Sequence, residues 1–305
     1  MATSKNKSGL SKLNKWIIGV VAGLIILVGL VLLFGTPSAE TVFNDMNEKM
    51  LETKSVTIDQ TMTLTNKDGG GVNTISSKLY MDLNSSSKLL AKGNFTFNII
   101  SNETPITASG DIIKIGEDSY VKYDGLSSTS SQLATSLSTT EAKLKGNWVK
   151  VRDNDSYASM AEIPLSFTSN IMPTPFANLN DAKRKNVVKI LQSKSMYNIE
   201  ESSSVDIEGV SAYKYVVTYD KDQFKKAADT IARYNSYFKS GDTSGDDLKT
   251  WTVWVNKSTR QIIKIEFIGT SSDGDYTGKI EFSGYNKEKS VEQPATYSIE
   301  SELVN

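Results

Sequence analysis

The 305-residue sequence contains no cysteine and no histidine. Without histidine, the chain lacks the side chain that most often exchanges protons near neutral pH, and it also lacks the usual zinc and copper ligand. Without cysteine, it has no thiol nucleophile, no disulfide bond and no cysteine that a lipid could modify. These absences exclude thiol chemistry, remove the usual zinc and copper ligands, and require the fold to be held by its own apolar core.

Two short stretches resemble functional motifs but lack key residues. Residues 85–88 (SSSK) fit S-x-x-K and residues 239–241 (KSG) loosely echo K-T-G, but no S-D-N lies between them, and residues 85–88 fall at an expected hairpin turn. Residues 242–247 are acidic like a calcium loop, yet the sixth position is Asp247 and the twelfth is Val253. No glycine-rich phosphate loop is present, and spacing along the chain cannot reveal paired carboxylates. We therefore expect no enzymatic activity, no cofactor and no metal site.

Residues 16–34 form an uninterrupted apolar run from Trp16 to Phe34. A helix of this length measures about 28 Å, close to the ~30 Å hydrocarbon core of a bilayer. Only basic charges precede the run, which favours a cytoplasmic amino end: Lys5, Lys7, Lys12 and Lys15. We expect residues 1–15 to be a cytoplasmic tail, 16–34 a single transmembrane helix in the cell membrane, 35–40 a linker and 41–305 an extracytoplasmic domain.

A cleaved signal peptide is the alternative interpretation of this run, because small residues stand just before Glu40. The run is longer than the apolar region of about 7 to 15 residues that signal peptides have, and Pro37 is a poor residue three positions before a cut. The uncleaved anchor is therefore favoured.

The charge balance after the run bears on the kind of partner. All 35 acidic residues follow it, with 30 of the 34 basic ones, so this part carries a formal charge of −5. Nucleic-acid binding needs clustered lysine and arginine, and the densest basic cluster is residues 183–185 at the start of an expected helix. We expect no nucleic-acid partner.

Most of the external part alternates polar and apolar residues with period two, which is typical of strands. In residues 55–64, for example, Val56, Ile58, Met62 and Leu64 alternate with polar residues. Such patterns predict about 10–11 strands, at residues 55–64, 75–83, 91–99, 111–115, 119–123, 147–151, 204–207, 213–219, 251–255, 263–267 and 276–282. Helical spacing predicts helices at 39–54, 181–195 and 222–238. The fold class is therefore α+β, an antiparallel sheet with helices on one face.

Two irregular segments interrupt these elements. Residues 152–180 combine Pro164, Pro173 and Pro175 with many apolar side chains, so they resist regular pairing and yet are too apolar to lie free in water. They form either a lid packed permanently on the core or a movable flap over an apolar cavity. Residues 126–146 are rich in serine and threonine and are expected to form a mobile surface excursion.

The element order resembles that of the LolA/LppX-like bacterial (lipo)protein carriers, over about residues 40–300. The stretches that carry this resemblance are SVTIDQTMTLT, GNWVKV, EGVSAYKYVVTYD and WTVWVNKSTRQIIKIEF. The resemblance implies a large, curved, unclosed antiparallel half-barrel with helices on its concave face and an apolar cavity for acyl chains. It implies a carrier or binder of lipids or lipid-linked molecules. Mycobacterial relatives have a lipid-modified cysteine where this chain has its apolar run, so a tethered protein would act locally rather than shuttle.

We therefore expect a membrane-anchored, non-catalytic binding protein for a lipid or other hydrophobic ligand of the cell envelope, with the bilayer and an acyl-chain ligand as partners. Strand parity selects the residues that would line the cavity: Met62, Met81, Phe95, Phe97, Ile265 and Phe267, with Ile171, Met172 and Phe176 at its mouth. The alternative is an anchored adhesion or interaction module in which these side chains fill the interior and an envelope protein binds outside.

Overall fold

The computed structural model describes residues 38–67, 71–84, 90–101, 104–130, 142, 144–151, 180–192, 197–219, 222, 229, 233, 247–271 and 274–299. The predicted tail and the predicted span at 16–34 lie outside the described residues, and so do Ile171, Met172 and Phe176. Within the described ranges, no helix has both the length and the apolar character needed to cross a bilayer.

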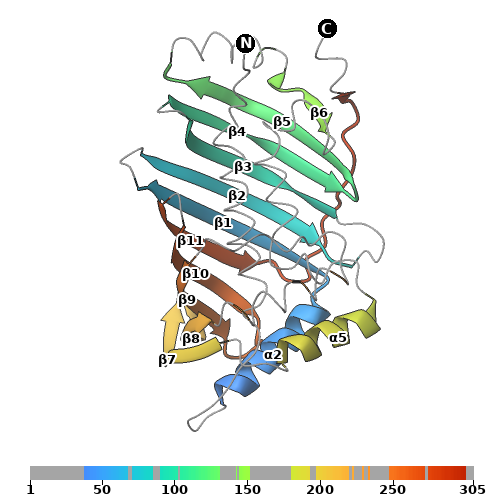
Figure 1. The fold of residues 1–305 in the computed structure, drawn as a ribbon. Coiled ribbons are helices and arrows are strands. Elements are labelled where there is room, and N and C mark those ends of the chain that lie inside the picture. Colours follow the sequence, from blue (N-terminus) through green and yellow to red (C-terminus); the bar gives the residue numbers. More distant parts are fainter. Residues whose placement is uncertain are drawn as a thin grey trace.

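Twelve strands of the described chain form one sheet in the order β12-β6-β5-β4-β3-β2-β1-β11-β10-β9-β8-β7 (Figure 1). All neighbours pair antiparallel except β12 with β6, and the two outermost strands do not meet, so the sheet is unclosed. The strands are β1 (Ser55–Asn66), β2 (Val72–Asp82), β3 (Leu90–Ser101), β4 (Thr104–Ile115), β5 (Asp118–Ser128), β6 (Trp148–Val151), β7 (Tyr197–Ile207), β8 (Val210–Tyr219), β9 (Asp247–Asn256), β10 (Ile262–Thr270), β11 (Gly274–Ser283) and β12 (Ser298–Ile299).

Strand β1 is the seam between the two halves of the chain. It pairs with β2 on one side and with β11 on the other. The chain runs outward from β1 to β6, and it returns from the β7 edge through β8, β9 and β10 to β11. The centre of the sheet is therefore completed only when a late strand pairs with the first one.

One face of the sheet is buried because the strands alternate as their sequence predicts. In β1, Ile58, Met62 and Leu64 are buried, whereas Thr61, Thr63 and Thr65 between and beyond them remain at least partly accessible. We call the buried side the inner face and the opposite side the outer face. Most of the apolar core of the described chain lies on the inner face.

Helix α2 (Ala39–Glu52) packs on the inner face. Ser38 caps it, because its Oγ accepts a hydrogen bond from the Thr41 N–H at 3.1 Å. The ring of Phe43 lies 5.1 Å from that of Tyr215 in β8. The whole apolar stripe of the helix is buried: Val42, Phe43, Met46 and Met50.

Helix α5 (Asp181–Gln192) contacts α2, and Figure 1 shows the two helices together at one end of the sheet. Both helices occur within a few residues of their predicted bounds. The third predicted helix, at 222–238, lies mostly outside the described residues.

The structure corrects the predicted strands, because the described residues form twelve strands rather than ten or eleven. The short strands predicted at 111–115 and 119–123 are the ends of β4 and β5, and the strand predicted at 204–207 is the end of β7. Leu126, predicted to start a surface excursion, is buried in β5. In β5 the alternation is interrupted by an extra residue, Asp124, which lies opposite the step from Ser109 to Gly110 in β4. Strand β7 exposes most of its side chains, so neither β5 nor β7 shows a clean period of two.

Residues 284–299, for which no sequence pattern predicted a position, pack across the outer face. The N–H of Lys289 donates to Tyr80 Oη at 2.9 Å, and the ring of Tyr297 meets that of Tyr120 edge-on at 5.1 Å. The segment ends in β12, which pairs in parallel with β6 (Figure 1). The end of the chain thereby links β11 at the centre of the sheet to its far edge.

Candidate ligand-binding face

The strand register places inner-face side chains in rows that run across the strands. The row that we call the apolar row is buried along its whole length and contains no polar side chain. Eight strands at a spacing of about 4.8 Å make it about 34 Å long. From β9 to β5 its members are Trp251, Phe267, Gly278, Met62, Ile75, Phe97, Ala108 and Leu126.

The neighbouring row, the mixed row, has a polar centre. Its ends are apolar or aromatic, and none of its members carries a charge at neutral pH. From β9 to β5 its members are Val253, Ile265, Ile280, Gln60, Ser77, Phe95, Gly110 and Tyr123. Burial raises the pKa of the Tyr123 phenol, which keeps this end of the row neutral.

The structure brings together five of the six predicted lining residues that it describes. Three lie in the apolar row (Met62, Phe97 and Phe267) and two in the mixed row (Phe95 and Ile265). Met81 is also buried on the inner face, but it lies four residues along β2 from Ser77, opposite Val56 and Ala91. The lining remains a prediction. Strand parity missed Trp251 and Ile75, although both sit at apolar positions of alternating segments.

Aromatic rings of both rows lie over glycines of the next strand. A Cβ on Gly278 would be only 1.9 Å from Cζ of Phe267. A Cβ on Gly110 would be 2.0 Å from the carbonyl oxygen of Lys122 and 3.0 Å from Cζ of Phe95. Glycine is therefore required at position 278 by the Phe267 ring and at position 110 by the backbone of β5. Glycines covered by cross-strand rings are a recurrent device for building curved sheets.

The polar centre of the mixed row is a hydrogen-bonded pair. Gln60 Nε2 donates to Ser77 Oγ at 2.9 Å, and the two residues are only 1% and 3% exposed. Among the residues that the structure describes, none donates a hydrogen bond to Gln60 Oε1, which is buried. A buried carbonyl oxygen without a partner costs about 1–3 kcal/mol. One sequence signal existed: Gln60 stands at an inward position between Ile58 and Met62.

A second polar feature of the inner face is Lys114, near the turn between β4 and β5. It is 7% exposed, and its Nζ donates to Ser119 Oγ at 2.9 Å and to the Glu117 carbonyl at 3.1 Å. Lys114 lies opposite Ala91, beyond the two rows. This cation therefore lies to one side of the two uncharged rows.

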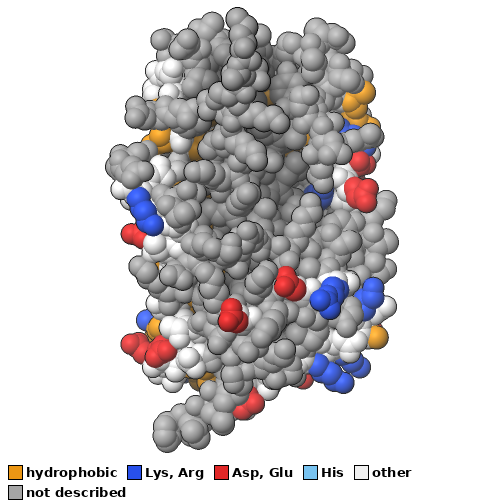
Figure 2. Space-filling model, viewed as in Figure 1, with side chains coloured by type: hydrophobic (Ala, Val, Ile, Leu, Met, Phe, Trp, Pro, Cys, Tyr) orange, Lys and Arg blue, Asp and Glu red, His pale blue; other side chains and the backbone are white. Residues whose placement is uncertain are grey.

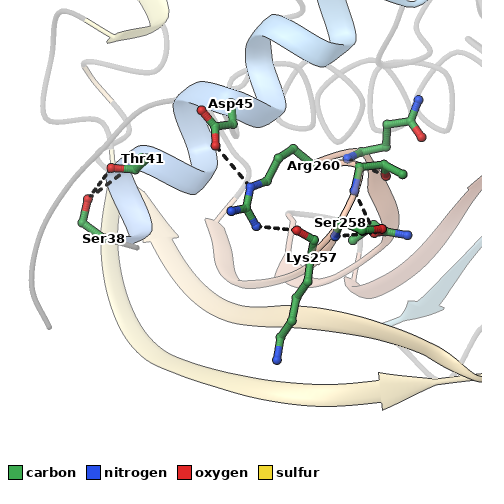
Figure 3. A network of polar contacts seen from close by, with 9 residues as sticks. Ser38, Thr41, Asp45, Lys257, Ser258 and Arg260 are labelled. Carbon is green, nitrogen blue, oxygen red and sulfur yellow. Dashed lines mark hydrogen bonds and ion pairs between the residues drawn. The ribbon is translucent and has the colours of Figure 1, made fainter. Parts of the chain in front are cut away.

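Helix α2 is tied to the sheet by an ion pair at the turn between β9 and β10 (Figure 3). Arg260 Nε lies 3.1 Å from Asp45 Oδ2, and Arg260 Nη1 donates to the Lys257 carbonyl at 2.7 Å. The guanidinium also stands over the ring of Tyr213, 5.3 Å from its centroid. Arg260 adopts this position with φ = +60°, a conformation that favours glycine.

On the outer face, lysines stack on aromatic rings. Lys122 lies over Trp148, and Lys214 and Lys264 lie over Trp254. One groove of about 370 Å³ is bordered by polar and aromatic side chains, among them Lys78, Tyr80, Lys92, Asn94, Asp111 and Trp148.

Charged side chains also lie over the two helices, where Figure 2 shows basic groups near α5. The exposed basic residues of α5 are Lys183, Lys185 and Lys189. Over the described ranges, no group of three acidic side chains is placed to hold a metal ion.

No protein-family model matches the sequence, and no relative was found among curated proteins. Solved structures resemble the chain at low identity. LprF from Mycobacterium bovis has a TM-score of 0.45 and 14% identity, over 86% of this chain and 100% of that one. The Mycobacterium tuberculosis lipoprotein LppX has a TM-score of 0.40 and 16% identity, over 83% of this chain and 97% of that one.

A LolA superfamily protein from Nitrosomonas europaea is also similar, with a TM-score of 0.23 and 10% identity, over 84% of this chain and 96% of that one. Two of these structures carry the names LppX and LolA superfamily, which are the names in the sequence resemblance.

Proposed function

We propose that this chain is a membrane-anchored, extracytoplasmic binding protein that holds a lipid or another hydrophobic ligand on its inner face without changing it chemically. The observation that carries the proposal is the apolar row. It extends for about 34 Å across eight strands of an unclosed sheet. Such a surface suits acyl chains, because burial of apolar groups needs no directional contacts.

Acyl-chain burial supplies enough free energy for this role. Each methylene removed from water contributes about 0.8 kcal/mol, so a chain of about 16 carbons gains roughly 13 kcal/mol when fully buried. Association and ordering of the chain offset part of this gain. A net value of about 8 kcal/mol corresponds to micromolar affinity, so partial burial already holds a ligand.

The proposed anchor would place the inner face beside a bilayer. Phe34 ends the apolar run four residues before Ser38, and four extended residues reach at most about 14 Å. Helix α2 begins just after Ser38 and packs on the inner face through Phe43. A ligand would therefore pass between the membrane and the inner face locally.

The test is native mass spectrometry of the full chain purified from a lipid-containing host, followed by denaturing extraction of bound molecules. The matched variants are Phe97→Asp, which places a charge in the apolar row, and Thr96→Asp, which places the same charge on the exposed outer face of β3. We expect a stoichiometric acyl-chain molecule on the wild type and on Thr96→Asp, and its loss from Phe97→Asp.

Circular dichroism checks that each variant is folded, and Ala108→Trp, which fills the same row by bulk, replaces Phe97→Asp if that variant unfolds. Equal lipid on all folded proteins would assign the lipid to the anchor rather than to the inner face. A wild type that carries no ligand would favour the alternative, an anchored interaction module.

A further inference from the structure

The polar pair Gln60 and Ser77 lies at the centre of the inner face. The two residues are directly opposite each other in β1 and β2, and five strands lie on one side of β1 and six on the other. Ile280 and Phe95 flank the pair across the strands. Apolar residues, Ile58 and Met62, flank Gln60 along β1. The pair is therefore a polar island within an apolar surface.

The Gln60 carboxamide lacks one hydrogen-bond partner in either of its two orientations. With Nε2 donating to Ser77 Oγ, Oε1 receives no hydrogen bond from the described part of the chain. With the carboxamide turned over, Oε1 accepts from the Ser77 hydroxyl, and the Nε2 hydrogens need an acceptor instead. In both cases Gln60 requires a partner that the two strands do not supply.

Among the groups that a lipid carries, a hydroxyl fits both cases, because it donates and accepts. An ester or ketone carbonyl only accepts, and a methylene does neither. We infer that Gln60 and Ser77 recognise a hydroxyl group on the acyl chain of the ligand. The inference rests on the proposed function, since it assigns the ligand of the same face to hydroxylated acyl lipids.

The pair and the apolar row have different roles in this binding. Apolar contacts hold an acyl chain with little preference for its position along the row, because the attraction is non-directional. A hydrogen bond to Gln60 is directional and fixes one carbon of the chain beside β1. The position of the hydroxyl along the chain should therefore decide affinity.

The experiment uses the full chain in phosphatidylcholine nanodiscs, with empty nanodiscs as background. Bound cis-parinaric acid is displaced by stearic acid, by a series of positional isomers of hydroxystearic acid and by the matching oxostearic acids. We expect one hydroxy isomer to displace the fluorophore about tenfold more effectively than stearic acid, which corresponds to about 1.4 kcal/mol. The matching oxo acid and the other isomers should gain much less.

Two variants assign this preference to the pair. Gln60→Leu should abolish the preference for one hydroxy isomer over stearic acid. The matched control is Thr61→Val, which breaks the equivalent hydrogen bond on the outer face of the same strands, where the Thr61 and Ser76 hydroxyls are 3.1 Å apart. Thr61→Val should keep the preference. Ser77→Ala gives the second measurement if Gln60→Leu does not fold.

The outcomes separate the inference from the proposed function. If stearic acid binds but no isomer is preferred, or if Gln60→Leu keeps the preference, the inference is overturned and the lipid-binding function stands. An oxo acid that equals the hydroxy acid overturns the assignment to a hydroxyl. If neither the fluorescent acid nor stearic acid binds the wild type above background, the proposed function fails and the inference fails with it.

Discussion

Replacing Gly278 by alanine tests the packing on which the inner face depends. In the structure, the Phe267 ring lies over Gly278, and a Cβ there would stand 1.9 Å from Cζ, 2.4 Å from Cε1 and 2.5 Å from Cε2. Carbon atoms pack at about 3.5–4.0 Å, so the ring must move by roughly 1.5–2 Å. Phe267 is 1% exposed and lies 5.5 Å from the Trp251 ring, so this movement disturbs its neighbours.

This overlap sets the loss of stability that we expect for Gly278→Ala. Inserting a methyl group into a packed core costs about 1–3 kcal/mol, and the near-complete overlap with the ring places Gly278→Ala at about 3 kcal/mol. Phe267→Ala removes the ring and costs about 3–5 kcal/mol on its own. In that background, Gly278→Ala should be neutral or slightly stabilising, because the clash is gone. The coupling free energy between the two positions should therefore be about 3 kcal/mol.

The assay is urea denaturation of the delipidated full chain, followed by tryptophan fluorescence, because bound ligand would raise the apparent stability. Gly125→Ala is the matched control. A Cβ at Gly125 meets only Ser109 Oγ, at 3.7 Å, which is an ordinary contact. The free energy of unfolding of Gly125→Ala should therefore stay within about 0.5 kcal/mol of the wild-type value. If Gly278→Ala is equally harmful with and without the Phe267 ring, the packing described above is wrong.

Three further predictions concern other parts of the sheet. In urea denaturation, Arg260→Ala should lower the free energy of unfolding by about 2 kcal/mol and Arg260→Gly by about 1 kcal/mol. Both variants lose the ion pair with Asp45, but only glycine adopts φ = +60° without strain. Equal losses of stability would refute this. Tyr297→Ala should release β12, so hydrogen exchange should accelerate in β12 and β6 but not in β1; unchanged exchange in β12 and β6 would contradict this. Burial raises the pKa of Tyr215 from 10.0 to about 12, so the stability that its neutral phenol contributes is complete below pH 10 and is lost as the pH rises to 12. In urea denaturation across this pH range, the free energy of unfolding of Tyr215→Phe should therefore fall less steeply with pH than that of the wild type. Equal slopes of the two proteins would count against this.

Local patterns predicted the elements whose burial is regular. In β1 every second residue from Val56 to Leu64 faces inward, and in α2 the apolar residues recur at helical spacing, so sequence alone places both elements. The same parity selected Met62, Phe97 and Phe267, which the structure brings into one row. These successes share one cause, because each depends on residues close together in the chain.

The other features could not be predicted from the sequence, mostly because they depend on pairing between distant parts of the chain. The position of β11 beside β1 depends on contacts across most of the chain, and no local pattern encodes it. The two residues of β12 are too few to show a period, and they are placed by Tyr297 packing on Tyr120. Gln60 was overlooked for a different reason: its position in an apolar alternation was visible, but its missing hydrogen bond emerges only when β1 and β2 are paired.

The inferred role of Gln60 also predicts how stability and binding oppose each other. In the unfolded chain water satisfies the carboxamide, whereas in the folded, empty protein its Oε1 has no donor within the described chain. Replacing both partners of a buried hydrogen bond by apolar groups is nearly neutral or stabilising. The double variant Gln60→Leu with Ser77→Ala should therefore unfold at an equal or higher urea concentration than the delipidated wild type.

The same double variant should gain less stability than the wild type when the preferred hydroxy acid is added, because a ligand stabilises in proportion to its affinity for the folded state. Tenfold weaker binding at saturating ligand corresponds to about 1.4 kcal/mol less stabilisation. Thus the empty variant should be as stable as the wild type or more so, and saturating ligand should shift the difference in stability by about 1.4 kcal/mol toward the wild type. A marked loss of stability in the empty variant would show that the pair serves the fold itself rather than the recognition of a ligand.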